Sequence, residues 1–383
     1  MTELPRSAEI VIVGGGAMGC SLAYHLASRG RRPLLLEGAT LGGGSTGRCS
    51  GGVRQQFATE INVRLGMRSV ALLRRFREEV GTDPGYRPIG YLLLATTSAL
   101  ARFLAANVAM QRGVGLEVDV VDPSEAARLA PGLTVDDVRA AAFCATDGVA
   151  GPHEITLGYA EAARRRGADL LETTPVTAIQ VEGGAIRGVA TAAGDVATPC
   201  VVNCAGPQAA LVGALAGARV DVTPIRRQLF QLAGPEEWGA GVPMTVDLGT
   251  TLHFHGEGDG LLFGLDDAGA APAGTMQVSW DVLDRLIDLA AHRLPRALDA
   301  TLRTAWAGLY EMTPDRQPFV GPAVGPEGLW LACGFSGHGF MLSLAVGESL
   351  AATMCGEPAA IDLGAFAPAR EAATGAIREQ LVF

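Results

Sequence analysis

The sequence predicts an α/β (mixed α+β) fold in which a Rossmann-like domain is assembled from discontinuous segments and a second domain is inserted into it. Three observations predict this arrangement. A strand, a glycine-rich turn and a helix open the chain within its first 30 residues. Similar α/β segments return in the middle and at the end of the chain. Strand-like runs dominate residues 220–310, which favours a mixed or antiparallel sheet in the inserted domain.

Length and composition limit the number of domains and the classes of protein to which the chain can belong. The chain has 383 residues, enough for about two or three domains, and 48% of them are hydrophobic against 18% charged, which excludes a disordered chain. The net charge is −10 and no basic tract is present, so nucleic acid is not expected as a partner. All 30 cationic side chains are arginine, which excludes mechanisms that require a catalytic lysine.

The cysteines do not indicate a metal or disulfide framework. Seven are present, and only Cys200 and Cys204 lie close together. This scatter is typical of buried thiols in a reducing cytosol, and no metal site is predicted. No apolar run reaches the roughly 18 residues of a membrane span, and the first ten residues lack the apolar core of a signal peptide, so we expect a cytoplasmic protein.

The first elements form a βαβ unit. Residues 10–13 are a β-branched run that predicts a strand, residues 14–19 are a glycine cluster, and residues 21–29 have helical spacing that ends at Gly30. Residues 33–36 predict a second strand that ends at Glu37. The glycine- and serine-rich residues after it predict a loop over 40–52.

The later elements follow from the same periodicities. Helices are predicted over 60–80, 99–112, 123–129, 154–166, 280–294 and 339–354. Strands are predicted over 89–96, 176–181, 186–191, 201–204, 228–232, 251–255, 261–265 and 329–333. We assign residues 1–80, 146–219 and 311–383 to the first domain, and residues 81–145 and 220–310 to the inserted domain.

The glycine cluster predicts a dinucleotide site. Gly14, Gly16 and Gly19 form G-x-G-x-x-G between a strand and a helix, where glycines permit a tight turn and a close approach of the pyrophosphate. Glu37 ends the second strand and suits a ribose hydroxyl. A second G-x-G-x-x-G at residues 42–47 is not followed by a helix. The prediction of a dinucleotide site at residues 14–19 therefore depends on the strand before them and the helix after them. The motif alone does not separate NAD from FAD.

Four blocks of the chain carry a family resemblance. They are the βαβ unit, the stretch GSTGRCSGGVRQQF at 44–57, the stretch VVNCAGP at 201–207, and the pair GLYEMTPD at 308–315 with GFSGHGF at 334–340. With these blocks the sequence resembles the D-amino-acid-oxidase-like family of FAD-dependent oxidoreductases. It is most similar to the branch of sarcosine oxidases, glycine oxidases and dye-linked L-proline dehydrogenase β-subunits.

The resemblance implies FAD and names the residues that bind it. The expected FAD-binding residues are Gly14, Gly16, Ala17, Met18, Glu37, Gly44, Ser45, Thr46, Arg48, Cys49, Ser50, Gly51, Gly52, Val176, Ala205, Gly206, Gly308, Gly334, Phe335, Ser336, Gly337, His338, Gly339, Phe340 and Met341. Sarcosine oxidases that hold their flavin covalently have a cysteine where this chain has Gly308, so non-covalent FAD is expected. The 334–339 turn at a helix start suits the flavin pyrimidine ring, where negative charge develops.

The resemblance also implies the residues on the substrate side. Arg54 matches the arginine that holds the substrate carboxylate in sarcosine oxidases, and an arginine fork suits a carboxylate. Tyr310 matches a tyrosine that orients the substrate. His255 shares a strand face with His253 and is the third catalytic candidate. The alternative interpretation is that His255 has a structural role. Arg226 and Arg227 are candidates for a second carboxylate contact.

The sequence departs from the sarcosine oxidase pattern where lysines are expected. Met341 replaces a carboxylate-binding lysine, and Leu262 lies nearest the position of the lysine that assists the reaction with oxygen. We therefore predict a dehydrogenase rather than an oxidase. The predicted reaction is oxidation of the C–N bond of a proline-, sarcosine- or glycine-like amino acid or secondary amine, by hydride transfer to flavin N5.

Two alternatives stay open. One is a flavin-dependent 2-hydroxy-acid dehydrogenase, because the same scaffold can oxidise a C–O bond. The other is a non-catalytic flavoprotein subunit or assembly factor. Expected partners are the small-molecule substrate and an electron-accepting partner subunit or a homo-oligomer.

Overall fold

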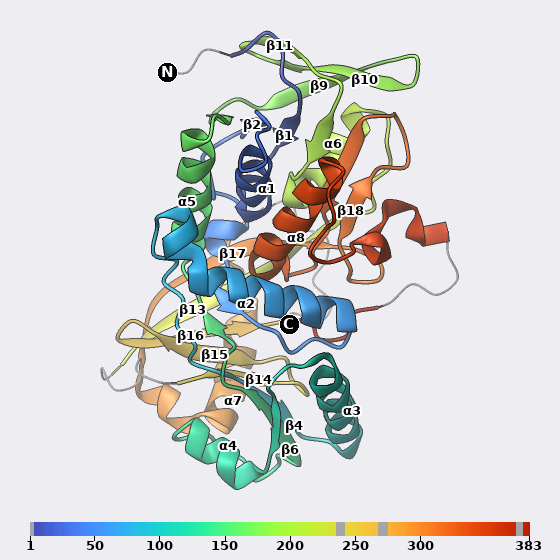
Figure 1. The fold of residues 1–383 in the computed structure, drawn as a ribbon. Coiled ribbons are helices and arrows are strands. Elements are labelled where there is room, and N and C mark those ends of the chain that lie inside the picture. The colour runs from blue at the N-terminus through green and yellow to red at the C-terminus, as the bar shows by residue number, and fades with distance from the viewer. Residues whose placement is uncertain (1–3, 235–241, 267–274, 373–377) are drawn as a thin grey trace.

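The computed structural model describes residues 4–234, 242–266, 275–372 and 378–383 (Figure 1). Its centre is a six-stranded sheet in the order β18-β19-β12-β1-β2-β8. The parallel strands are β1 (Val11–Val13), β2 (Leu34–Leu36), β8 (Asp169–Leu171), β12 (Val201–Asn203) and β19 (Leu329–Cys333), and the antiparallel edge strand is β18 (Phe319–Pro322). The predicted α/β class and the assembly of this sheet from distant segments are confirmed.

Helices cover this sheet on the face that carries the largest apolar cluster. Figure 1 shows α1 (Ala17–Ala27) between α5 (Pro152–Arg165) and α8 (Gly339–Met354), with α2 (Glu60–Val80) crossing below them. Helices α1 and α8 pack closely because Gly347 has no side chain; a Cβ there would lie 2.2 Å from Ser21 Oγ. Helix α1 begins four residues before its predicted start, because the glycine turn leads directly into it.

A small three-stranded sheet lies at the end of the molecule near the N-terminus (Figure 1). It consists of β9 (Val176–Glu182), β10 (Ala185–Thr191) and β11 (Gly194–Ala197), and α6 (Ala209–Leu215) follows β12. The predicted Gly183-Gly184 turn joins β9 to β10, and both glycines have positive φ.

The second large sheet has eight strands in the order β17-β13-β16-β15-β14-β4-β6-β5. Its strands are β4 (Tyr91–Ala95), β5 (Asp119–Val121), β6 (Ala140–Cys144), β13 (Thr223–Ala233), β14 (Met244–Asp247), β15 (His253–Glu257), β16 (Gly260–Leu265) and β17 (Thr301–Met312). Among the described strands of this sheet, only β14 and β4 pair in parallel, which confirms the expected mixed sheet. Helices α3 (Ser98–Val114), α4 (Pro123–Leu129) and α7 (Leu283–Arg293) belong to the same part of the chain, and β3 (Gly52–Val53) pairs with β7 (Gly148–Val149).

Strand β17 was not predicted and is one of the longest in the protein. It pairs with β13 from Thr223 opposite Met312 to Ala233 opposite Thr301, and a bulge leaves Arg303 without a partner on β13. Our predicted domain boundary between residues 310 and 311 falls inside this strand. The strand therefore runs from the edge of the eight-stranded sheet into the segment assigned to the first domain, and the domain boundaries remain a prediction.

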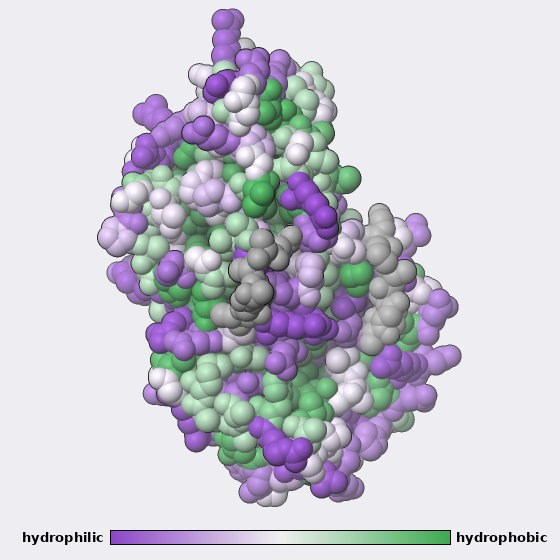
Figure 2. Space-filling model, turned by 90° about the vertical axis from the view of Figure 1, so that its right-hand side faces the viewer, coloured by the Kyte–Doolittle hydropathy of each residue, from purple (hydrophilic) through white to green (hydrophobic). Residues whose placement is uncertain are grey.

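The surface is mixed in polarity. Figure 2 shows polar and apolar side chains interspersed on the face that includes α3, with weakly apolar side chains gathered in its lower part. None of the helices in the described ranges is both long and apolar enough to pass through a membrane. Within those ranges no group of three or more His, Cys, Asp or Glu side chains is arranged to hold a metal ion.

Candidate active site

One cavity of about 590 Å³ passes between the six-stranded sheet and the eight-stranded sheet. Its wall starts at the end of β2, continues along the turn between β1 and α1 and the loop over 42–50, and reaches the start of α8. Strands β13, β15 and β17 of the larger sheet close the other end. The volume is in the range of small-molecule and cofactor sites.

Glu37 lies at the β2 end of the cavity. Its Oε2 accepts a hydrogen bond from the backbone N–H of Gly15 (2.7 Å), and its Oε1 accepts one from Ala39 (2.8 Å). These two bonds fix the carboxylate against the glycine turn, near Pro175 and Val176, which also line the cavity. Each carboxylate oxygen keeps further acceptor capacity, so Glu37 can accept hydrogen bonds from ribose hydroxyls while it is held in place.

The start of α1 faces the middle of the cavity. Gly14 has a φ of +110°, and a Cβ there would lie 2.4 Å from the Cys204 carbonyl oxygen, so only glycine permits this turn. The Ala17 N–H donates to Thr46 Oγ1 (3.1 Å), which holds the 42–50 loop over the helix N-terminus. The first N–H groups of a helix have no partner within the helix and attract an anion such as a phosphate.

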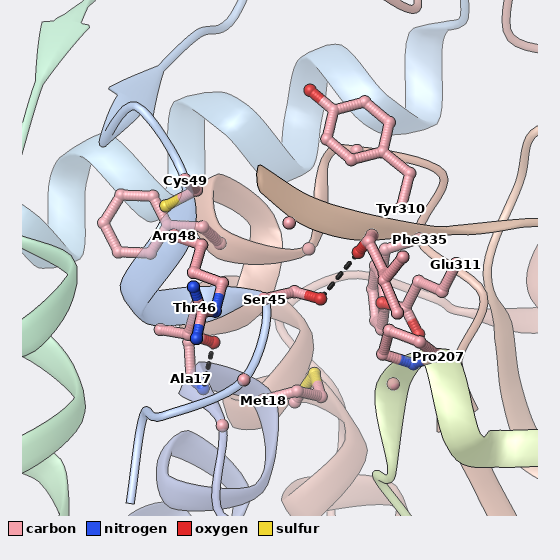
Figure 3. A pocket seen from close by; sticks show the side chains of 18 of the residues that line it. Ala17, Met18, Ser45, Thr46, Arg48, Cys49, Pro207, Tyr310, Glu311 and Phe335 are labelled. Carbon is pink, nitrogen blue, oxygen red and sulfur yellow. Dashed lines mark hydrogen bonds between the residues drawn. The ribbon is translucent and has the colours of Figure 1, made fainter. Parts of the chain in front are cut away.

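The 42–50 loop is held from its other side by β17. Ser45 Oγ donates to the Leu309 carbonyl oxygen (2.6 Å), and Trp306 Nε1 donates to the Arg48 carbonyl oxygen (2.9 Å). Figure 3 shows Ser45, Thr46 and Arg48 on one side of the cavity and Pro207, Glu311 and Phe335 on the other. Arg48 Nε is buried without a hydrogen-bond partner among the described residues.

These features fit a bound dinucleotide. A carboxylate lies at one end of the cavity, the N-terminus of α1 and a buried arginine N–H lie in the middle, and the N-terminus of α8 lies at the other end. The first three would hold the ribose and pyrophosphate, and the turn before α8 would face the flavin.

Two titratable groups lie at the turn before α8, Glu311 of β17 and His338 of the turn itself. Glu311 Oε2 accepts a hydrogen bond from the Gly334 N–H (2.8 Å), and burial raises the pKa of Glu311 to about 7. His338 is 2% exposed, and burial together with the nearby Arg54 charge lowers its pKa to about 4. We therefore expect a neutral imidazole at neutral pH. Its ring meets the Phe57 ring edge-on, with centroids 5.2 Å apart, so packing defines its position.

Arg54 is a buried cation at the end of the cavity closed by the eight-stranded sheet. It is 2% exposed and contacts two aromatic rings, with its guanidinium carbon 4.3 Å from the Phe57 centroid and 4.5 Å from the Phe383 centroid. Its Nη atoms donate to the carbonyl oxygens of Gln56 (2.6 Å) and Leu381 (2.8 Å). Its Nε has no partner, and no carboxylate in the described part of the chain pairs with it. Burial lowers its pKa.

Tyr310 and Arg227 lie beside this cation. The Arg227 guanidinium carbon is 5.2 Å from the Tyr310 ring centroid, and an ion pair of 2.5 Å joins Arg227 to Asp266. The Tyr310 hydroxyl donates to the Phe383 carbonyl oxygen (3.1 Å). Burial raises the pKa of Tyr310, so its hydroxyl stays protonated and can donate a hydrogen bond.

Most of the predicted site residues line this cavity. Arg54, Tyr310 and the predicted FAD-binding residues do so with three exceptions, which are Gly51, Gly334 and Ser336. These three support the wall instead; Ser336 Oγ, for example, accepts a hydrogen bond from the Thr313 N–H (3.1 Å). Their assignment as binding residues remains a prediction.

The structure places His255, predicted as a catalytic residue, away from the cavity wall. His253, and not His255, lines the cavity, because β15 passes the cavity only at its first residues. His255 is 1% exposed, and its Nε2 lies 3.5 Å from Glu257. Leu262 likewise does not line the cavity, whereas Leu265 of the same strand does.

Sequence reasoning missed several residues of the site. Phe383 lines the cavity, and Glu379 holds the segment that carries it. Asp147 is fully buried and accepts hydrogen bonds from Gln55 and Gln56, which fixes the loop after Arg54. The only sequence indication for Asp147 is an acidic residue in an otherwise apolar and glycine-rich stretch.

The chain is similar to known flavoproteins over nearly its whole length. The family model described as "DAO: FAD dependent oxidoreductase" matches residues 9–353. The structure is similar to the crystal structure of L-proline dehydrogenase from P. horikoshii, with 32% sequence identity, a TM-score of 0.92, and coverage of 98% of this chain and 100% of that one.

Two curated relatives differ in length. Human mitochondrial sarcosine dehydrogenase is 30% identical over 364 residues, which is 91% of this chain and 40% of that protein. Glycine oxidase from Geobacillus kaustophilus is 29% identical over 378 residues, 94% of this chain and 97% of that protein. The chain therefore spans less than half of the first relative and nearly all of the second.

Proposed function

The chain belongs to the DAO family of FAD-dependent oxidoreductases, and from that premise we propose that it oxidises the C–N bond of an amino acid or secondary amine. FAD is the cofactor of this family, as predicted. A proline-, sarcosine- or glycine-like substrate is supported by relatives whose printed names are L-proline dehydrogenase, sarcosine dehydrogenase and glycine oxidase.

One observation carries this proposal. Arg54 is a buried cation that lines the cavity, and no carboxylate in the described residues forms an ion pair with it. A buried charge is costly unless an opposite charge compensates it. The carboxylate of an amino-acid substrate supplies that charge, and the free Nε–H gives it a hydrogen-bond donor.

The other residues would position the substrate. The Tyr310 hydroxyl donates its proton to the Phe383 carbonyl oxygen and can accept a hydrogen bond from the substrate amine, and Arg227 adds positive charge above its ring. The apolar wall formed by Met244, Leu265 and Met341 holds the carbon skeleton and excludes water. FAD held along the start of α1 and the turn before α8 would supply the hydride acceptor for the carbon next to nitrogen, and water would hydrolyse the imine product.

A dehydrogenase that passes electrons to an acceptor other than oxygen is the favoured form. The chain has no lysine, so a lysine ammonium cannot assist the reaction with oxygen. Met341 lines the cavity where the sarcosine oxidase pattern has a lysine. An electron-accepting partner subunit or a homo-oligomer is part of the same proposal.

The direct test is an anaerobic absorbance titration of the FAD-loaded protein with proline, sarcosine, glycine and a panel of D-amino acids, followed by air. Bleaching of the flavin bands by one amine, with slow reoxidation in air, is the expected result. Fast reoxidation would show an oxidase. Bleaching only by 2-hydroxy acids, or by nothing, would contradict the proposal in favour of a hydroxy-acid enzyme or a non-catalytic subunit.

A further inference from the structure

The segment 379–383 crosses the substrate end of the cavity. The Leu381 carbonyl oxygen accepts a hydrogen bond from Arg54 Nη2 (2.8 Å), and His338 Nε2 lies 3.4 Å from the same oxygen. Two residues further on, the Phe383 carbonyl oxygen accepts a hydrogen bond from the Tyr310 hydroxyl (3.1 Å). The segment therefore contacts Arg54, His338 and Tyr310, three residues that line the cavity.

A buried carboxylate fixes this segment. Glu379 is fully buried and accepts hydrogen bonds from the Ala58 N–H (3.0 Å), Thr59 Oγ1 (2.9 Å) and Asn62 Nδ2 (2.9 Å) at the start of α2. Its Oε1 also accepts from the Leu381 N–H (2.9 Å). Such a set of partners defines one position for the segment relative to Arg54.

The Phe383 ring closes one side of the guanidinium. The Phe57 ring also contacts the guanidinium, and both Nη atoms donate to backbone carbonyl oxygens, so Nε is the guanidinium nitrogen without a partner among the described residues. A carboxylate that pairs with Arg54 can bond this Nε–H, beside the Phe383 ring that lines the same cavity. Any substituent of the ligand that points toward 383 meets the aromatic ring.

We propose that Phe383 is a specificity-determining residue of the substrate site, and that its ring restricts the site to carboxylates with a small substituent next to the carboxyl-bearing carbon. Glu379 acts as a positioning residue, because it holds the segment that places the ring over Arg54. The proposal rests on the proposed function for the identity of the ligand as an amino acid, but the geometry it describes applies to any carboxylate bound at Arg54.

The first test measures binding without turnover. Acetate and phenylacetate are titrated into the FAD-loaded protein, and the shift of the flavin absorbance bands gives two dissociation constants. We expect the wild type to prefer acetate, and Phe383→Ala to change the ratio by about 10-fold or more in favour of phenylacetate. Phe383→Leu, which keeps much of the volume, should give an intermediate ratio.

The control is Phe103→Ala. Phe103 is a partly buried residue of α3 that packs on the core and does not line the cavity. This variant loses the same volume and should leave the ratio of dissociation constants unchanged. An equal ratio in the wild type and Phe383→Ala would overturn the proposal, as would the absence of binding of either carboxylate to any of these proteins.

A second measurement separates this proposal from the function. Sarcosine and N-benzylglycine differ only in the size of the nitrogen substituent, and their rates of anaerobic flavin reduction should show the same change of preference in Phe383→Ala. Glu379→Gln, which frees the segment, should shift the preference in the same direction by less. If no amine reduces the flavin while the carboxylate ratio still changes, the proposed function fails and the role of Phe383 stands.

Discussion

Gly337 lies directly against the ring of Tyr310. A Cβ on Gly337 would come within 2.4 Å of Tyr310 Cε2, and the backbone φ of Gly337 is +95°. The glycine therefore meets two requirements at once, because only glycine adopts this conformation easily and leaves room for the ring. The contact joins the turn before α8 to strand β17, which are the two elements between which the flavin and the substrate would meet.

Replacing Gly337 should lower the stability of the protein by more than backbone strain alone would, because the new side chain also clashes with Tyr310. We expect Gly337→Ala to lower the free energy of unfolding by about 3 kcal/mol and to reduce FAD content, because strain and a steric clash add together. The control is Gly356→Ala, where φ is +71° and no atom lies within 4 Å of the added Cβ, so that only strain of about 1 kcal/mol applies. Denaturant unfolding measures both, and equal losses would contradict the contact.

Arg54→Lys should weaken substrate binding without releasing FAD. Lysine keeps the charge but loses the planar fork, so we expect KM for the amino-acid substrate to rise by about 10- to 100-fold, the equivalent of about one charged hydrogen bond. Arg226→Lys is the matched control, because Arg226 does not line the cavity. Steady-state kinetics with an artificial electron acceptor measure the change, and an unchanged KM would remove Arg54 from the carboxylate site.

Glu311 should make stability depend on pH. Its carboxyl has a pKa of about 7 in the folded protein against 4.5 in the unfolded chain, mainly because of burial. Between these values the folded protein keeps a proton that the unfolded chain has released. The free energy of unfolding therefore falls as pH rises from about 4.5 to about 7, by at most about 3 kcal/mol from this group.

Glu311→Gln removes this titration and keeps an acceptor for the Gly334 N–H. Urea unfolding of the FAD-loaded proteins at pH 5 and pH 8 should give a smaller loss of stability with rising pH in the variant than in the wild type. Glu60→Gln, at an exposed position at the start of α2, serves as control and should behave as the wild type. A variant whose loss equals that of the wild type would show that Glu311 ionises as an ordinary carboxyl.

The flavin should be extractable. Gly308 stands where covalently linked relatives have a cysteine, and a Cβ at this position would lie 3.2 Å from the Arg48 Cβ. Acid precipitation of the yellow protein should therefore leave FAD in the supernatant and a colourless pellet. Cys49 lines the cavity, and burial raises the pKa of its thiol to about 11, which disfavours the reactive thiolate. A yellow pellet that turns colourless in Cys49→Ser would instead place a linkage at that cysteine.

The elements predicted with correct bounds are helices in which a regular apolar pattern coincides with residues that typically begin or end a helix. Helices α2, α4 and α8 have their predicted bounds. In α2 a regular apolar stripe ends at Gly81, whose positive φ stops the helix. The glycine turn before α1 was predicted for the same reason, because its function requires a local backbone conformation that only glycine adopts easily.

Features that depend on distant contacts were not predicted. Strand β17 contains small and polar residues and becomes a strand through its long pairing with β13. The alternation of His253 and His255 predicts a shared face but cannot show which end of the strand reaches the cavity. Nothing local indicates that Glu379 bonds Thr59 across 320 positions of the chain, so the segment that carries Phe383 was also missed.

The position of Tyr310 along strand β17 decides on which face of the sheet its side chain lies. Side chains alternate along a strand, so adding or removing one residue between Trp306 and Tyr310 would turn the tyrosine to the opposite face of the sheet. The bulge at Arg303 lies at the far end of the strand and already accommodates one extra residue there. Insertions and deletions are therefore tolerated at that end. In the part of β17 that leads into the cavity, the number of residues is fixed.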